Sequence, residues 1–331
     1  MSSDRFAQTR ARRALQGLGL ELPDTLVRAA STRNEVHVAP RQVVRVNCRP
    51  DQRLRREGLL CQALPGESYF PNVLGYSGDT GYDFVVIERK PGRAVSRAWP
   101  DMDKTRRRKF ISELSRALRL LHSVPTPPVA TRMHENPHLL NPAAVSPVVP
   151  ILMAVDELIG KGDVDRMLLQ DIADLVNDHG SALDDYHQRT LIHGDLSFEN
   201  VMVDVNGLSA LLDFEWSRGA PPDLELDVLL RFLRFPEAHV PPDVAATLSS
   251  LDFEDVPGWI AEDYPELFAH PRVVERLALY CVAFDMAELV RATSIPSLSN
   301  MGPLHPVRRL QNLLEGVSPL REQLDRLSLR T

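Results

Sequence analysis

Three polar residues that could carry chemistry, Asp195, Asn200 and Asp213, stand in the otherwise apolar stretch LIHGDLSFENVMVDVNGLSALLDFEW, residues 191–216. Burying a charged group is costly unless a partner compensates for it, and a metal ion is one such partner. The dipeptide Asn206-Gly207 is typical of the turn of a β-hairpin. Such a hairpin brings Asn200 and Asp213 close together, with Asp195 on the loop just before it. Oxygen ligands of this kind suit Mg²⁺, which also binds phosphate oxygens.

The order and spacing of these residues indicate phosphoryl transfer. Protein kinases use a loop Asp, an Asn five residues later, and the Asp of a downstream Asp-Phe-Gly motif. The matching segments here are His193-Gly194-Asp195, Asn200 and Asp213-Phe214-Glu215. The alternative is a solvent-facing hairpin whose acids only cap turns. Three such residues at this spacing favour the catalytic interpretation.

With these motifs the chain resembles the aminoglycoside phosphotransferase and choline-kinase-like enzymes, which are small-molecule relatives of protein kinases. The resemblance covers roughly residues 20–300. It implies a bilobal protein-kinase-like fold, ATP or GTP as phosphate donor, and Mg²⁺ as cofactor. It also implies that Asp195 is the catalytic base or orients the acceptor hydroxyl, and that Asn200 and Asp213 bind the metal.

The resemblance implies supporting roles for two further residues. His193 is expected to stabilise the catalytic loop through hydrogen bonds. Asp227, in DLELDVLLRF, resembles the family's buried Asp that holds this loop through backbone hydrogen bonds. An ordinary acid at a helix N-terminus, favoured by the helix dipole, is an equal alternative for Asp227.

The same fold needs a cation on the nucleotide phosphates, paired with a carboxylate on a helix. Arg45 in QVVRVN and Glu57 in RLRREGLL occupy the matching places. Many family members have Lys where this chain has Arg45, and Arg offers a fork of donors with a different reach. The alternative is an outward-facing strand Arg and a surface Glu.

A glycine-rich loop over the phosphates is absent, because no Gly occurs between Gly19 and Gly58. The turn is expected to use residues 31–34 instead. Within it Ser31 and Arg33 can reach phosphate, and Asn34 tolerates left-handed backbone geometry. An ordinary hairpin turn is equally compatible. FVVIERKPG resembles the strand and linker that bind the adenine edge, so Glu88 and Lys90 are expected to contact the base through their main chains.

The acceptor is expected to bind in the helical lobe near Asp195. The acidic candidates are Glu215, Glu225, Asp255, Glu262, Asp263, Asp285 and Glu288. Asp285 and Glu288 share one face of an apolar helix. They suit either a cationic acceptor or salt bridges with Arg231, Arg234 or Arg291. The first reading predicts an aminoglycoside or a basic peptide antibiotic as acceptor, and hence antibiotic resistance. The alternatives are a macrolide, a nucleoside antibiotic, a metabolite such as choline, or a catalytically inactive binding protein.

The elements that must position these residues follow from the apolar pattern. A leading helix is expected at about 4–19, strands near 25–31, 35–39 and 42–47, a helix at 51–64, and two strands within 71–92. The remainder is expected to be mostly helical, at 103–125, 151–188, 223–235, 243–250, 258–268, 271–293 and 305–328. The pattern predicts an α+β, bilobal kinase-like fold: a small, mostly antiparallel β lobe with one key helix over 1–92, and a larger α-helical lobe over 93–331.

Composition narrows the class of protein further. The chain has 331 residues and a net charge of −7, which argues against nucleic acid as a partner. Its three cysteines, Cys48, Cys61 and Cys281, lie far apart and predict neither a disulfide framework nor a zinc site. There is no secretory signal, and the apolar run VVPILMAV is too short to span a membrane. A cytoplasmic monomer or homodimer is therefore expected.

Overall fold

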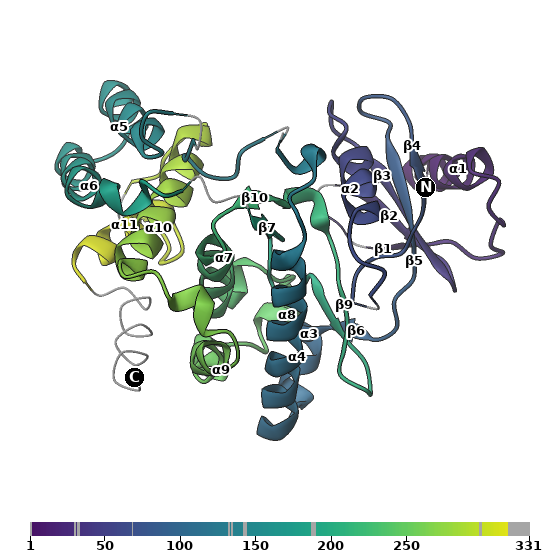
Figure 1. Cartoon of the computed structure of the whole chain (residues 1–331). Coiled ribbons are helices and arrows are strands. Elements are labelled where there is room, and N and C mark those ends of the chain that lie inside the picture. The colour runs from purple at the N-terminus through teal and green to yellow at the C-terminus, as the bar shows by residue number, and fades with distance from the viewer. Residues whose placement is uncertain are drawn as a thin grey trace.

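The structure, a computed structural model, describes residues 2–29, 31, 34–67, 69–131, 133, 135–141, 144–186, 190–297 and 300–316. It has a mixed α+β architecture, in which an antiparallel five-stranded sheet near the N-terminus is followed by a mostly helical remainder (Figure 1). This is the fold class predicted from the sequence. The lobe boundary at residue 92 stays a prediction.

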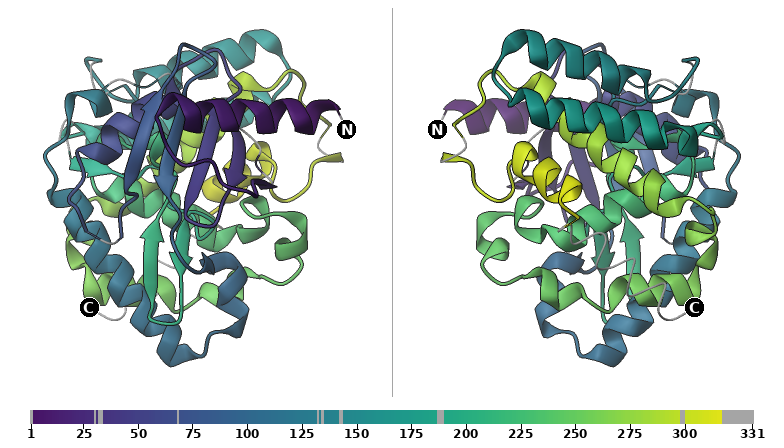
Figure 2. Two further views of the ribbon diagram at one scale, coloured as in Figure 1. Left: turned by 90° about the vertical axis from the view of Figure 1, so that its right-hand side faces the viewer. Right: turned by 90° about the vertical axis from the view of Figure 1, so that its left-hand side faces the viewer.

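The five-stranded sheet has the order β1-β2-β3-β5-β4, and all neighbouring strands are antiparallel. Side chains alternate between the faces of a strand. Val44 and Val46 of β3 therefore pack with Leu15 of α1 on one face, and Figure 2 shows α1 crossing that face. Arg45 points to the opposite face, where Leu54 of α2 packs. The bounds are α1 Ser2–Gly17, β1 Val27–Ala29, β2 Asn34–Val38, β3 Gln42–Asn47, α2 Arg53–Gln62, β4 Val73–Ser77 and β5 Phe84–Glu88.

The helical remainder is built around α4, which packs against α9 and β7. Helices α5 and α6 lie at the end of the molecule farthest from the five-stranded sheet (Figure 1). The bounds are α3 Val95–Ala98, α4 Lys104–Ser123, α5 Val149–Lys161, α6 Arg166–His179, α7 Asp223–Arg234, α8 Pro242–Ala245, α9 Val256–Asp263, α10 Val273–Arg291 and α11 Pro306–Leu314. No helix within the described ranges is long and apolar enough to cross a bilayer.

Two small sheets frame the segment that holds the predicted catalytic residues. One is the hairpin β8–β9 with β6 on its edge, and the other is the pair β7–β10. The bounds are β6 Arg93–Ala94, β7 Thr190–Ile192, β8 Val201–Val203, β9 Leu208–Leu211 and β10 Arg218–Ala220. Phe198 anchors the loop between β7 and β8 in the core, because its side chain is fully buried. Its ring packs on Trp99 and Phe232, with centroid distances of 5.2 and 5.0 Å.

Three predicted helices are shorter than expected. The helix predicted at 243–250 is limited to Pro242–Ala245. The one predicted at 258–268 ends at Asp263, because Pro265 restricts the preceding Tyr264 to a non-helical conformation (φ −141°, ψ 63°), and a 3₁₀ turn follows. The one predicted at 305–328 is observed as Pro306–Leu314, and the positions from 317 onward lie outside the described residues.

Candidate active site

The loop that follows β7 is held by the His193 side chain. The Asp195 amide donates to Nδ1 of His193 at 3.3 Å, so Nε2 carries the proton and donates to the Leu212 carbonyl at 2.8 Å. The ring also packs on Phe214, with centroids 4.6 Å apart. Burial lowers the pKa of His193 and so favours this neutral form. The imidazole thus ties the catalytic loop to the segment that carries Asp213.

A buried carboxylate holds the same loop from behind, and it is Glu225 rather than the expected Asp227. Glu225 accepts hydrogen bonds from the amides of His193 and Gly194, the latter at 3.2 Å. Asp227 faces away from the loop: its Oδ1 accepts from the Cys281 thiol at 3.2 Å and its Oδ2 lies 3.6 Å from Arg231. The assignment of Asp227 to the loop is therefore wrong. Two residues along a helix differ by about 200° in direction, so only one of the two acids can face the loop.

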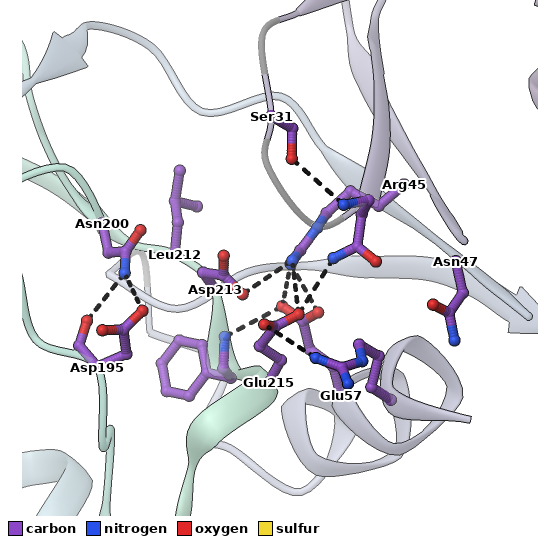
Figure 3. Close-up of polar contacts among 12 residues, drawn as sticks. Ser31, Arg45, Asn47, Glu57, Asp195, Asn200, Leu212, Asp213 and Glu215 are labelled. Carbon is purple, nitrogen blue, oxygen red and sulfur yellow. Dashed lines mark hydrogen bonds and ion pairs between the residues drawn. The ribbon is translucent and has the colours of Figure 1, made fainter. Parts of the chain in front are cut away.

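The three predicted catalytic and metal-binding side chains lie together (Figure 3). Nδ2 of Asn200 donates to both the carbonyl and the Oδ2 of Asp195, at 2.8 and 3.0 Å. Asn200 and Asp213 are neighbours across the hairpin, since the Leu212 amide donates to the Asn200 carbonyl at 2.8 Å. Oδ1 of Asn200 is then the atom left to bind a metal.

Asp213 is held in an unusual backbone conformation. Its φ is +65°, and within the described part of the chain it is the only residue other than glycine with a positive φ. Such a conformation is costly and persists only where surrounding contacts enforce it. Here the next amide, that of Phe214, donates to Oε1 of Glu57 at 3.1 Å. The turn directs the Asp213 carboxylate away from the hairpin and toward Arg45 (Figure 3).

Arg45 and Glu57 form the expected buried ion pair. Nη1 of Arg45 lies 2.6 Å from both carboxylate oxygens of Glu57, and Nη2 donates to Oδ1 of Asp213 at 2.8 Å. A third carboxylate, that of Glu215, lies 3.5 Å from Nη2. The guanidinium fork therefore connects the sheet, α2 and the Asp213 segment, as a single ammonium group could not.

Three carboxylates, those of Glu57, Asp213 and Glu215, surround the single positive charge of Arg45. Burial, together with the nearby Asp213 and Glu215, raises the pKa of Glu57 to about 7, although Arg45 opposes the shift. Burial also raises the pKa of Glu215, and the neighbouring Asp213 adds to the effect. A site with such an excess of oxygen-bearing acids fits a hard cation, and Mg²⁺ takes few protein ligands beside phosphate and water. Asn200 and Asp213 match that requirement. The described residues contain no cluster of three or more His, Cys, Asp or Glu suited to a metal.

The segment expected to cover the phosphates is only partly described. Arg33 lies outside the described residues. The Asn34 amide lies 3.4 Å from the Ser31 hydroxyl oxygen, which accepts its hydrogen bond. Asn34 does not adopt the left-handed conformation suggested from the sequence, because it starts strand β2. Its side chain instead donates to Oε2 of Glu215 at 3.1 Å, and so connects the start of β2 to the segment that carries Asp213.

Glu88 and Lys90 stand at the end of β5, where the chain leaves the sheet. The Glu88 amide donates to the Asn72 carbonyl at 2.9 Å, so the Glu88 carbonyl is the main-chain group left to contact a base. The Glu88 side chain is half exposed and lies 4.0 Å from Nζ of Lys90.

The acids proposed to bind an acceptor are paired with cations of the chain itself. Oδ1 of Asp285 accepts from Arg231 at 3.0 Å and from Arg309 at 2.8 Å, and Glu288 pairs with Arg309 at 2.6 Å. The geometry thus favours the salt-bridge alternative for Asp285 and Glu288. Glu215 pairs with Arg53 and Arg45. The remaining candidates are also paired: Asp255 with Lys104, and Glu262 and Asp263 with Arg108.

A cleft of about 510 Å³ opens beside the N-terminus of α2. A smaller cavity shares Arg53 and Glu135 with it and extends to Arg56, Glu215 and Trp216. Glu215 and Trp216 follow Asp213 closely in the chain, so the smaller cavity borders the segment that carries Asp213. Its lining is Arg49, Pro50, Asp51, Gln52, Arg53, Thr80 and Glu135.

Sequence reasoning missed several residues that hold the site. Arg56 donates to the carbonyls of Glu215 and Ser217, and Arg53 pairs with Glu215. Arg53, Arg56 and Glu57 are spaced three and four apart, which places them on one face of α2. From that spacing, both arginines could have been predicted to face the site together with Glu57. Arg218, which lies directly behind Gly194, gives no such signal.

The fold matches solved structures over nearly its whole length. An aminoglycoside phosphotransferase, APH(4)-Ia, in a ternary complex with ADP and hygromycin B has a TM-score of 0.59 and 13% identity, covering 93% of this chain and 96% of that chain. ADP-bound APH(2'')-Ib has a TM-score of 0.58 and 17% identity, covering 90% and 95%. A gentamicin complex of APH(2")-IIa has a TM-score of 0.57 and 14% identity, covering 90% and 93%. At these identities the likeness shows the fold alone.

The family follows from the sequence itself. Residues 28–261 match the model of the phosphotransferase enzyme family, APH, and the chain belongs to this family. The matched range includes the Arg45–Glu57 pair, the catalytic loop and the Asp213 segment. Among curated proteins, no sequence matches the chain significantly.

Proposed function

We propose that this protein is a Mg²⁺-dependent O-phosphotransferase that moves the γ-phosphate of ATP or GTP to a hydroxyl group of a small molecule. The observation that carries the proposal is the convergence of Asp195, Asn200 and Asp213 at the mouth of one hairpin, opposite the Arg45–Glu57 pair. Nucleotides bound to structurally similar proteins, ADP in one and GDP in another, support a nucleotide donor.

Each residue has a defined part in this proposal. Asn200 Oδ1 and the Asp213 carboxylate hold Mg²⁺, which when bound offsets charge on the phosphate oxygens. Asp195 Oδ2, oriented by Asn200 Nδ2, accepts the proton of the acceptor hydroxyl as its oxygen attacks. Arg45 binds the nucleotide phosphates, and its side chain is held in place by Glu57. The hydrogen bond from Asn34 to Glu215 fixes the start of the neighbouring strand β2.

The base is proposed to bind at the end of β5 through the main chains of Glu88 and Lys90. Ser31 and Arg33 are proposed to contact phosphate, Ser31 through the hydroxyl that accepts a hydrogen bond from the Asn34 amide. The cytoplasm, where nucleotide triphosphates are abundant, is the proposed location. The three cysteines are free thiols, as that environment favours.

The acceptor is proposed to enter through the cleft beside α2 and reach Asp195 past Trp216. A cationic antibiotic is the first candidate, because proteins of similar fold bind hygromycin B and gentamicin. Antibiotic resistance would follow from such an activity. A hydroxylated metabolite is the second candidate, and the pairing of the chain's acids with its own arginines favours it over a polycation.

The experiment that tests the proposal combines binding with turnover. ATP and GTP binding is measured by calorimetry with Mg²⁺ and with EDTA, and phosphate gain is measured by mass spectrometry on a panel of aminoglycosides, basic peptides, macrolides and amino alcohols. Asp195→Asn is expected to keep nucleotide affinity and lose transfer, whereas Asp213→Ala loses the Mg²⁺-dependent part of binding.

A catalytically inactive binding protein is the competing proposal. It predicts that the protein binds a nucleotide or a small molecule but transfers no phosphate, not even to water. Equal phosphate transfer by the wild type and Asp195→Asn would remove the role assigned to Asp195, and metal-independent nucleotide binding would remove the role of Asn200 and Asp213.

A further inference from the structure

Arg218 is a buried cation that no step of the proposed function uses. It starts strand β10 opposite Ile192 of β7, and only 5% of its surface is exposed. Its Nη1 donates to the Trp216 carbonyl at 2.9 Å. Its Nε and Nη2 are buried and have no hydrogen-bond partner among the described residues. Burying a charged group with unsatisfied donors lowers the free energy of unfolding, so the position of Arg218 needs a physical reason.

The guanidinium lies directly behind the catalytic loop. A Cβ atom added to Gly194 would come within 2.5 Å of Nη1 of Arg218 and 2.4 Å of the Trp216 carbonyl oxygen. Gly194 also has a φ of +79°, which favours glycine. Protein kinases carry an arginine at this loop position, in the motif His-Arg-Asp. Here glycine leaves a space, and an arginine from the neighbouring strand occupies it.

The surroundings of Arg218 contain more than one titratable group. Tyr186, Glu225 and Asp195 all favour its charged form, while burial opposes it. Burial lowers the pKa values of Arg56 and His138, which belong to other elements of the fold, and the charge of Arg218 adds to this effect. Glu225 holds the loop through two amides, and Asp195 is the proposed base. Arg218 therefore lies among the groups that hold and form the catalytic loop.

We propose that Arg218 is a positioning residue of the catalytic loop: its guanidinium fixes the turn at Gly194 from behind. The inference rests on the proposed function for the role of Asp195. It does not require Arg218 to touch the nucleotide or the acceptor. The guanidinium acts through the position of the loop that carries Asp195.

The test compares Arg218→Met and Arg218→Lys with Arg234→Met. Arg234 is a matched control, because it is equally buried but donates to the Leu230 carbonyl and the Cys281 thiol, away from the loop. Turnover is measured as Mg²⁺-dependent ATP hydrolysis, with water as the acceptor. Arg218→Met is expected to lower kcat at least 30-fold and to keep the Kd for Mg·ATP within threefold.

Arg218→Lys keeps the charge without the fork, so it is expected to restore only part of kcat. A purely structural role would lower Tm in Arg218→Met and Arg234→Met alike and would lower kcat in both. Unchanged kcat in Arg218→Met, or an equal fall of kcat in Arg234→Met, overturns the inference. If Arg218→Met does not fold, a kcat of Arg218→Lys equal to that of the wild type overturns it instead.

Hydrogen exchange provides a reading that does not depend on turnover. The Gly194 and Asp195 amides donate to Glu225 and His193, so exchange of the peptide 191–197 reports the order of the loop. Exchange is expected to rise at least tenfold in Arg218→Met and to stay unchanged in Arg234→Met. A wild type without ATP turnover would count against the proposed function, whereas equal exchange in both variants would count against the positioning role of Arg218.

Discussion

Glu225 accepts a hydrogen bond from the amide of Gly194 at 3.2 Å, from a position 31 residues further along the chain. The same carboxylate accepts from the His193 amide and lies 3.7 Å from Nε2 of His122. Although burial opposes ionisation, the contacts with His122 and His193 outweigh it and lower the pKa of Glu225. One ionised side chain at the start of α7 therefore fixes the backbone that presents Asp195.

Replacing Glu225 with Gln is expected to damage both stability and catalysis. The amide side chain offers one oxygen and no charge, so the free energy of unfolding should fall by about 3 kcal/mol. Chemical denaturation and Mg²⁺-dependent ATP hydrolysis measure the two effects. Asp227→Asn is the control: it removes a buried acid from the same helix but leaves the loop amides paired. Loss of hydrolysis in Asp227→Asn, with Glu225→Gln active, would contradict the assignment.

Arg45→Lys tests whether the fork of the guanidinium matters. An ammonium group cannot contact Glu57 and Asp213 with separate, rigidly spaced donors as Arg45 does. The Kd for Mg·ATP is expected to rise about tenfold, equivalent to about 1.4 kcal/mol, in calorimetric titrations. Arg41→Lys is the control, because Arg41 lies in the turn between β2 and β3 and pairs with Glu21 on the exposed surface. An affinity equal to that of the wild type would mean that one ammonium suffices.

Gly194→Ala should be far more harmful than an ordinary glycine substitution. The new methyl group would stand 2.4 Å from the Trp216 carbonyl oxygen, in a backbone conformation with φ of +79°. The expected cost is about 3 kcal/mol of unfolding free energy or more, read as a large fall in Tm together with loss of nucleotide turnover. Gly66→Ala, where a Cβ meets no atom within 4 Å, should change Tm little. Equal effects of the two substitutions would exclude a steric role for Gly194.

Glu57 should make the nucleotide-free protein less stable as the pH rises. Its pKa is raised from 4.5 to about 7 in the folded chain, so the folded state binds more protons than the unfolded state between these values. The stability that this group contributes is present below pH 4.5 and is lost as the pH rises through 7. In denaturation experiments from pH 5 to 8, the stability of Glu57→Gln relative to the wild type should therefore increase with pH. A difference that is constant over this range would show that Glu57 does not titrate there.

The sequence determined the parts of the site that depend on local pattern. Asp195, Asn200 and Asp213 are joined by one hairpin, and an Asn-Gly turn between apolar strands is enough to bring the last two together. The alternation of β3 and the helical spacing of α2 likewise direct Arg45 and Glu57 to facing surfaces. These contacts follow from the period of a strand or a helix, which residue order alone expresses.

The tertiary structure alone decided which distant side chains complete the site. Asn34 meets Glu215 across 181 positions and Arg45 meets Asp213 across 168, and no local period encodes either distance. The choice of Glu225 over Asp227 depends on how α7 is rotated against the loop, which the packing of its apolar side sets. Arg218 reaches Gly194 only because β10 pairs with β7. Long-range packing fixes such contacts, since it determines which buried charges share a desolvated space and must therefore pair.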